Sequence, residues 1–239
     1  MPAPIAVGLD FDHTLGIDNK LERTVALEML AVLALAKNIS YDTGEAQRAI
    51  DGVLTRARSG EATIEAAIAG FFERFAPAGS ATMDTAQEFR DTVVARAPQH
   101  IEARPGAEAM LAALDALGVR YAILTNGWSP LQEEKARLIG FRGSVFVSER
   151  IAARKPAREA FGLLVKHFDL PPAAVWYVGD DPEMDIAGAA AAGLTTVWYD
   201  WEGRAYADRV ARPAYTIAHL DELPALLQGR IDEVANRKE

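Results

Sequence analysis

Ile5-Ala-Val-Gly-Leu-Asp-Phe-Asp-His-Thr14 is the stretch that decides the fold of this 239-residue chain. It starts as a short apolar run and ends in Asp10 and Asp12, a pattern typical of a buried strand with polar groups at its carboxyl end. Similar runs recur at 121–126, 144–148, 174–180 and 195–200. Helical segments lie between them, for example 106–117 and 131–139, each followed by a glycine. This alternation predicts an α/β fold with a parallel sheet covered on both faces.

Residues 19–97 interrupt the alternation of strands and helices. Four stretches there have helical patterns, with no convincing strand between them: 21–36, 44–58, 64–75 and 82–97. We therefore expect an α-helical domain at 19–97, inserted after the first strand into a core made of 1–18 and 98–239. Its helices would lie over the carboxyl edge of the sheet, where ligands bind in open α/β folds.

The composition limits the partners and the ligands. A formal net charge of −9 repels a polyanion, so no nucleic acid polymer is expected as a partner. A small phosphorylated metabolite remains compatible, because local cations can outweigh the distant field. Without cysteine, any metal must be held by oxygen or histidine ligands. No apolar run approaches the roughly 20 residues of a membrane span, and no signal peptide is recognisable. We expect a cytoplasmic protein without a membrane partner, as a monomer or homodimer.

Two clusters of carboxylates follow predicted strands. Asp10 and Asp12 would repel each other unless a cation or a shared proton relieves the repulsion, although an isolated pair of this kind is more often a loop or an N-cap. The second cluster is Gly179-Asp-Asp-Pro-Glu-Met-Asp185, which alone could be an acidic helix start. Oxygen-rich clusters without cysteine suit a hard cation such as Mg²⁺. Together the clusters favour a metal site.

Two further segments offer groups that suit an oxyanion. Thr125-Asn126-Gly127 ends a strand with a hydroxyl, an amide and a flexible backbone, although this segment taken alone favours a simple turn that uses Asn-Gly to reach positive φ. Lys155 precedes Pro156, which favours an extended backbone at the lysine. By itself this lysine would be a solvated surface residue.

In this order, the four segments resemble the haloacid dehalogenase-like hydrolase superfamily. The matching motifs are Asp10-x-Asp12-x-Thr14, Thr125, Lys155, and Gly179-Asp180 with Asp185. The resemblance covers 1–18 and about 100–225 but not the insertion, and it implies a Rossmann-like three-layer core with an α-helical cap domain. The runs at 124–141 and 147–156 are similar to pyrimidine 5'-nucleotidase-like and N-acylneuraminate-9-phosphatase-like members. Arg154 departs from these members, which usually carry a small residue there.

The resemblance implies a Mg²⁺-dependent phosphatase acting on a small phosphate monoester, with a nucleoside monophosphate and a sugar phosphate as candidate substrates. Asp10 would be the nucleophile that forms an aspartyl-phosphate, and Asp12 the general acid and base. Thr125, Asn126 and Lys155 would bind the phosphoryl group, with Thr125 and Lys155 contributing to catalysis.

The same resemblance implies the metal ligands and their support. Asp10, the backbone carbonyl of Asp12, and Asp180 would hold Mg²⁺, with Asp181 as a rival for the position of Asp180. Three residues would support these ligands without binding the metal themselves. Thr14 would brace the loop, Asp185 would orient Lys155 or a metal-bound water, and Asp181 would belong to this group if it is not the ligand.

Several alternatives remain open. A phosphomutase shares the whole constellation, whereas haloacid dehalogenases of this superfamily typically replace Asp12. A non-catalytic phosphate-binding module on the same fold is a further alternative. We interpret His13 as loop structure, Trp176 and Trp198 as core residues, and Trp128 as core or rim packing. No specificity residue in 19–97 is assigned, because solvated helix faces explain its charges.

Overall fold

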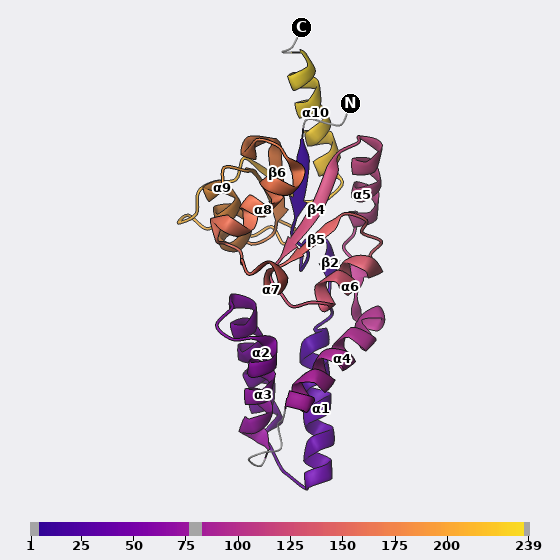
Figure 1. Cartoon of the computed structure of the whole chain (residues 1–239), viewed down its shortest axis with the longest axis vertical. Coiled ribbons are helices and arrows are strands. Elements are labelled where there is room, and N and C mark those ends of the chain that lie inside the picture. The colour runs from indigo at the N-terminus through magenta and orange to yellow at the C-terminus, as the bar shows by residue number, and fades with distance from the viewer. Residues whose placement is uncertain (1–4, 77–82, 237–239) are drawn as a thin grey trace. The chain divides into compact units, whose positions relative to one another are not determined.

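The computed structural model describes residues 5–76 and 83–236. The chain divides into two compact units, a core unit of Met1–Ile17 with Glu102–Glu239 and a helical unit of Asp18–Ile101 (Figure 1). The sequence predicts a core of 1–18 with 98–239 and an insertion of 19–97. In the structure the first boundary lies one residue earlier than predicted, and the second lies four residues later. The larger difference arises because Pro98 does not end the last helix of the insertion, which continues to His100.

The core unit is built on a six-stranded sheet with the order β5-β4-β1-β6-β7-β8. All neighbouring strands in it are parallel. The strands are β1 Ala6–Leu9, β4 Arg120–Thr125, β5 Ser144–Val147, β6 Val175–Gly179, β7 Thr195–Tyr199 and β8 Tyr215–Ile217. The sequence predicts the first five, but three residues are too few for β8 to show a recognisable pattern. The predicted Rossmann-like α/β fold is confirmed.

Helices cover both faces of this sheet (Figure 1). On one side, α8 Arg158–Phe168 and α9 Gly188–Ala191 pack against β4, β6 and β7. On the other, α5 Ala107–Ala116 packs against β4 and α10 Glu222–Asn236. Trp176, Trp198 and Trp128 are all buried, as expected for core residues.

Shorter elements follow the strands at the carboxyl edge. After β4 comes α6 Leu131–Leu138, and after β5 comes α7 Ser148–Ile151. A 3-10 turn, Pro172–Ala174, precedes β6, and a π-helix, Pro182–Ala187, follows it. A two-stranded antiparallel ribbon joins β2 Gly16–Ile17 to β3 Glu102–Ala103. The chain leaves the core unit after β2 and returns in β3.

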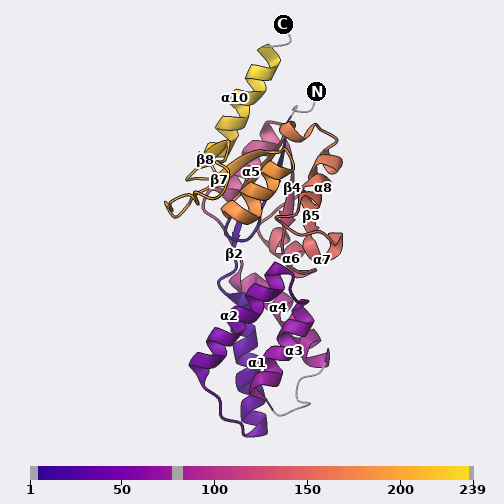
Figure 2. The same cartoon turned by 90° about the vertical axis from the view of Figure 1, so that its left-hand side faces the viewer.

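Among its described residues, the helical unit contains four helices; Figure 2 shows them from the side. They are α1 Leu21–Lys37, α2 Thr43–Ser59, α3 Ile64–Phe75 and α4 Met83–His100. The predicted start of the fourth at Thr82 lies outside the described residues. Two N-terminal caps follow from the sequence: Asp42 accepts from the Glu45 N–H at 2.6 Å and Thr63 from the Ala66 N–H at 3.2 Å. In the part of the chain described, no helix has both the length and the apolar character of a membrane span.

Candidate active site

Asp10 lies directly beyond the end of β1, at the carboxyl edge of the sheet. Its backbone N–H donates to the Val178 carbonyl at 2.9 Å, so the residue is still held beside β6. The chain then folds back on itself, since the N–H groups of Leu15 and Gly16 both donate to the Phe11 carbonyl, at 2.9 and 3.0 Å. Asp10 stands at the start of this turn and is buried, with its side chain 8% exposed.

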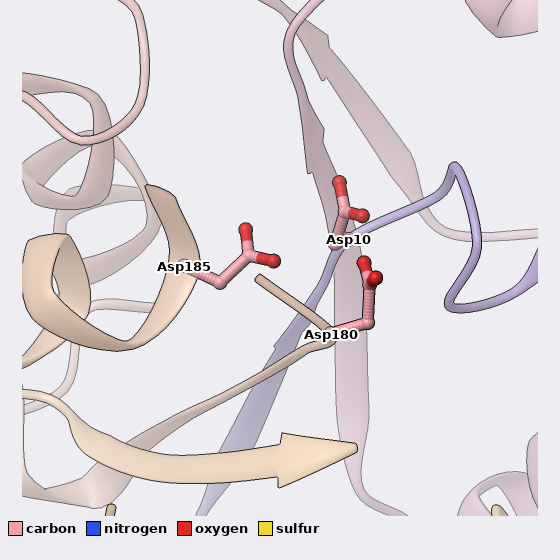
Figure 3. A group of neighbouring side chains, drawn as sticks. All are labelled: Asp10, Asp180 and Asp185. Atoms are coloured by element: carbon pink, nitrogen blue, oxygen red, sulfur yellow. The ribbon is translucent and has the colours of Figure 1, made fainter. Parts of the chain in front are cut away.

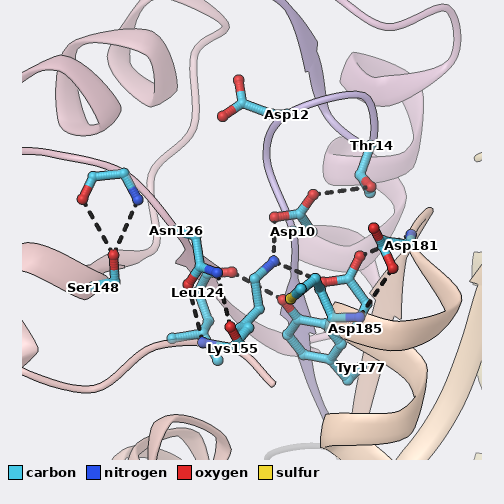
Figure 4. Close-up of polar contacts among 12 residues, drawn as sticks. Asp10, Asp12, Thr14, Leu124, Asn126, Ser148, Lys155, Tyr177, Asp181 and Asp185 are labelled. Carbon is cyan, nitrogen blue, oxygen red and sulfur yellow. Dashed lines mark hydrogen bonds and ion pairs between the residues drawn. The ribbon is translucent and has the colours of Figure 1, made fainter. Parts of the chain in front are cut away.

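Lys155 connects two of the predicted carboxylates. Its Nζ donates to Asp10 Oδ1 at 2.5 Å and to Asp185 Oδ1 at 2.7 Å (Figure 4). Lys155 is 4% exposed and Asp185 is 1% exposed, so water screens these ion pairs little. Thr14 Oγ1 approaches the second oxygen of Asp10 at 3.4 Å. The carboxylate of Asp10 is therefore held from both sides.

Asp180 completes a cluster of three carboxylates with Asp10 and Asp185 (Figure 3). One oxygen from each lies within 4.8 Å of the others, a spacing that a single cation can bridge. Asp181 has a different part: its Oδ1 accepts from the Glu183 and Met184 N–H groups at 2.8 and 2.9 Å, which caps the π-helix. Its own N–H donates to Asp185 Oδ2 at 3.0 Å. The geometry favours Asp180 over Asp181 as a ligand.

The charges of this cluster are unbalanced. Burial, together with the neighbouring Asp185 and Asp180, raises the pKa of Asp10 well above its usual value, although Lys155 opposes the shift. Burial and Asp185 raise the pKa of Asp180 to about 6. Burial disfavours the charge on Lys155, but Asp10 and Asp185 outweigh it and raise the lysine pKa. With all three carboxylates ionised and one ammonium beside them, the formal charge of the cluster is −2, which one divalent cation would neutralise.

Arg204 does not remove this imbalance. It is well exposed, and its guanidinium lies 3.5 Å from Asp180 Oδ2, at the limit of a hydrogen bond. Oxygen ligands around uncompensated negative charge suit Mg²⁺. The described residues therefore fit a divalent cation, held by Asp10 and Asp180 with Asp185 beside them.

Asn126 holds Lys155 in place. Its Nδ2 donates to the Lys155 carbonyl at 2.9 Å and its Oδ1 accepts from the Lys155 N–H at 3.0 Å (Figure 4). Thr125, the last residue of β4, is buried beside it, and its binding of a phosphoryl group stays a prediction. Neither Asn126 nor Gly127 has a positive φ, so the turn explanation for this dipeptide is wrong. A role of Asn126 in substrate binding is not needed to explain its contacts.

Asp12 projects from the other side of the loop from Thr14 (Figure 4). Its Oδ1 accepts from Lys135 Nζ at 2.8 Å and its Oδ2 from Gln132 Nε2 at 3.1 Å. His13, the next residue, has φ 66° and is exposed, consistent with its interpretation as loop structure.

Sequence reasoning missed several residues that shape the site. Ser148 Oγ accepts from the Gly127 N–H at 3.0 Å, which ties the ends of β4 and β5 together. Tyr177 donates to the Leu124 carbonyl at 2.9 Å, and its ring lies 5.7 Å from Lys155 Nζ. No local pattern distinguishes these two. Lys135 carried a usable signal, because it falls on the apolar stripe of α6, four residues after Leu131.

Comparisons with known proteins found relatives of similar sequence. The chain is 33% identical over 127 residues to pyrimidine 5'-nucleotidase YjjG of Escherichia coli, covering 52% of this chain and 56% of that protein. It is 34% identical over 134 residues to human N-acylneuraminate-9-phosphatase, covering 54% of each. The chain thus spans about half the length of the curated relatives it matches. Both are members of the subgroups that the sequence resembles.

The fold also matches that of a dehalogenase, whose activity differs from the activities of the two relatives above. A 2-haloacid dehalogenase from Pseudomonas syringae pv. Tomato superposes with a TM-score of 0.73 at 22% identity, over 96% of this chain and 99% of that one. Identity at this level shows the fold alone. The family model of haloacid dehalogenase-like hydrolases matches residues 6–193, which include all four motifs. The chain belongs to the haloacid dehalogenase-like hydrolase family.

Proposed function

We propose that this protein is a Mg²⁺-dependent phosphatase that hydrolyses a small phosphate monoester through an aspartyl-phosphate on Asp10. One observation carries the proposal: Asp10 and Asp180 belong to a compact acidic cluster whose only described ammonium, Lys155, contacts the nucleophile. Asp12 lies two residues away with a separate set of contacts, so the two aspartates can perform different tasks.

In the first step, a carboxylate oxygen of Asp10 attacks phosphorus, and the bond from phosphorus to the leaving oxygen breaks. Asp12 gives a proton to that oxygen, which leaves as an alcohol. Lys155 and Thr125 bind the phosphoryl oxygens and stabilise their charge. Asn126 keeps the backbone of Lys155 fixed meanwhile.

In the second step, Asp12 takes a proton from water while the water oxygen attacks phosphorus. The bond from phosphorus to Asp10 breaks, which releases inorganic phosphate and restores both aspartates. Mg²⁺, when held by Asp10, the backbone carbonyl of Asp12, and Asp180, would neutralise charge between the nucleophile and the phosphate. Asp185 orients Lys155 throughout.

A haloacid dehalogenase is the main rival, since solved dehalogenases share the fold. Displacement at carbon needs neither a general acid two residues after the nucleophile nor a divalent cation to screen an anionic substrate. Asp12 with its own buried partners and the uncompensated acidic cluster therefore support phosphoryl transfer. A phosphomutase would use the same groups and differ by excluding water from the aspartyl-phosphate.

The substrate class rests on the relatives. Those reported above are named for a pyrimidine nucleotide and for a sugar acid phosphate, and each matches about half of its length. We propose a nucleoside monophosphate or a sugar phosphate as the substrate, with cytoplasmic action. A panel of both classes, assayed for phosphate release, would identify it, and transfer to a second sugar hydroxyl would instead identify a mutase.

The nucleophile is tested by Asp10→Asn. The amide is nearly isosteric but cannot form the acyl phosphate, so turnover of p-nitrophenyl phosphate should fall by at least about 10³-fold while the protein stays folded. Wild-type protein quenched during turnover should carry an extra mass of about 80 Da on the peptide that contains Asp10, as covalent catalysis requires.

The matched control is Asp208→Asn, an exposed aspartate paired with Arg212, which should keep wild-type activity. Substantial turnover by folded Asp10→Asn protein would rule out this nucleophile. Chloride release from a 2-haloacid without phosphate release would favour the dehalogenase.

A further inference from the structure

The carboxylate of Asp12 is held by two side chains of α6 that no motif includes. Lys135 Nζ donates to one oxygen at 2.8 Å and Gln132 Nε2 to the other at 3.1 Å. The contacts span 123 and 120 residues of chain, so the tertiary fold brings them together. The Asp12 side chain is 27% exposed, whereas Lys135 is 1% exposed.

The burial of Lys135 makes this contact unusual for a lysine. Burying an ammonium group is strongly unfavourable unless a charged or polar partner compensates it. Lysine on a helix normally extends into water, yet Lys135 occupies the buried stripe of α6 with Leu131 and Ala136. Lys155 serves Asp10 in the same way, so each aspartate of the Asp-x-Asp pair has its own buried lysine.

Gln132 reaches Asp12 because residue 127 has no side chain. A Cβ at Gly127 would lie 2.6 Å from Gln132 Nε2 and 2.8 Å from its Cγ, which is too close for either atom to stay. Gln132 is 3% exposed, and its Oε1 has no hydrogen-bond partner within the described residues. The Gln132 side chain thus donates from Nε2 to the carboxylate of Asp12 while its Oε1 accepts no hydrogen bond from the described residues.

We propose that Lys135 and Gln132 are positioning residues that fix the carboxylate of Asp12 for proton transfer to the leaving group and from water. This inference rests on the proposed function, in which Asp12 is the general acid and base. Two donors on two oxygens fix the plane of the carboxylate, and proton transfer is sensitive to displacements of this group by about 1 Å. In this role Lys135 acts through Asp12, whose Oδ1 accepts from its Nζ.

A double-mutant cycle separates this role from others. Lys135→Met keeps the length of the side chain and removes the charge, and it should lower kcat on an alkyl phosphate about 10-fold, within the range of couplings between contacting residues. KM and inhibition by inorganic phosphate should change by less than about twofold, because ground-state binding is unaffected. In an Asp12→Asn background, Lys135→Met should lower kcat no further.

The leaving group gives a second readout. p-Nitrophenolate needs little protonation, so Lys135→Met should slow the aryl ester less than the alkyl ester in the first step. Gln132→Met should act in the same direction, and Gly127→Ala should mimic it by displacing Gln132. The matched control is Arg137→Met on the same helix, where the exposed pair with Glu134 is lost and turnover should not change.

Equal losses from Lys135→Met in both backgrounds, or a loss confined to KM, would overturn the inference, because Lys135 would then act on the fold or on the phosphate. Thermal unfolding of each variant distinguishes a folding defect, and Gln132→Met tests the inference if Lys135→Met does not fold. Wild-type protein without phosphatase activity, or Asp12→Asn with full activity, would instead refute the proposed function.

Discussion

At the scale of single residues, Asn126 illustrates how a side chain in the candidate site can act through another residue. Both polar atoms of its amide are bonded to the backbone of Lys155, at 2.9 and 3.0 Å. Because the backbone of Lys155 is fixed, its ammonium group stays within reach of Asp10 and Asp185. The amide and the lysine lie 29 residues apart in the chain, so the neighbours of Asn126 in the sequence do not reveal the pairing.

Tyr121 provides a prediction about pH. Burial, followed by the hydrogen bond from its hydroxyl to Asp115, raises the pKa of Tyr121 to about 12 from 10.0. The folded protein therefore keeps a proton that the unfolded chain releases between these values. Stability contributed by Tyr121 is present below pH 10 and lost as the pH rises toward 12. Tyr121→Phe should flatten the decrease in denaturation midpoint over this window, and an unchanged slope would show that the phenol is not perturbed.

At the scale of elements, the site depends on close approaches at the ends of strands. Gly179 ends β6, and a Cβ there would overlap the carboxylate of Asp185. Gly127 follows β4 and leaves room for Gln132 in the same way. Neither glycine has a positive φ, so space and not backbone conformation explains both residues. These glycines let the π-helix and α6 bring polar groups to the sheet edge.

Gly179→Ala tests this explanation. The added methyl should displace Asp185 from Lys155, lower stability by about 1–3 kcal/mol, and reduce turnover. The matched control is Gly162→Ala within α8, where a Cβ meets nothing within 4 Å. That change should stabilise the protein by about 0.5–1 kcal/mol through helix propensity and leave activity unchanged. Urea unfolding and a phosphatase assay measure both, and equal effects of the two substitutions would contradict the steric explanation.

At the scale of the whole molecule, negative charge affects both the choice of partners and the stability of the fold. A net charge of −9 disfavours polyanions, and the cluster of Asp10, Asp180 and Asp185 adds local repulsion that opposes folding. A cation that binds the folded protein and not the unfolded chain relieves this repulsion. Metal binding should therefore appear in stability as well as in activity.

Metal removal should abolish turnover in EDTA, and Mg²⁺ should restore it, with Ca²⁺ a poor substitute because its coordination is larger and looser. Mg²⁺ at 100 times its Kd should also stabilise the protein by about 2.7 kcal/mol, visible as a higher Tm. Asp180→Asn should remove most of this increase, whereas Asp181→Asn should retain it. Full activity in chelator, or a Tm that does not respond to Mg²⁺, would contradict the metal site.

The sequence by itself determined the α/β class, the helical insertion and the order of the four motifs. These features depend on local signals, because the period of apolar residues separates strands from helices and glycines mark where they end. Parallel strands bring their carboxyl ends to one edge, so the approach of the segment 179–185 to Asp10 could also be anticipated, and the family resemblance added Lys155 to them. The three-residue strand β8 and the continuation of α4 past Pro98 could not, since β8 is defined by its pairing with β7, and the last residue of α4, His100, accepts at its carbonyl from the distant Asn19.

Only the tertiary structure decided what each polar side chain contacts. Asp180 and Asp181 are adjacent and chemically identical, yet the turn after β6 sends one to the acidic cluster and uses the other as a cap. Lys135 pairs with Asp12 across 123 residues. Beyond the end of a strand the side-chain direction depends on the turn, and contacts between distant segments depend on how strands are ordered in the sheet. Neither the side-chain direction nor the order of the strands is a local property of the chain.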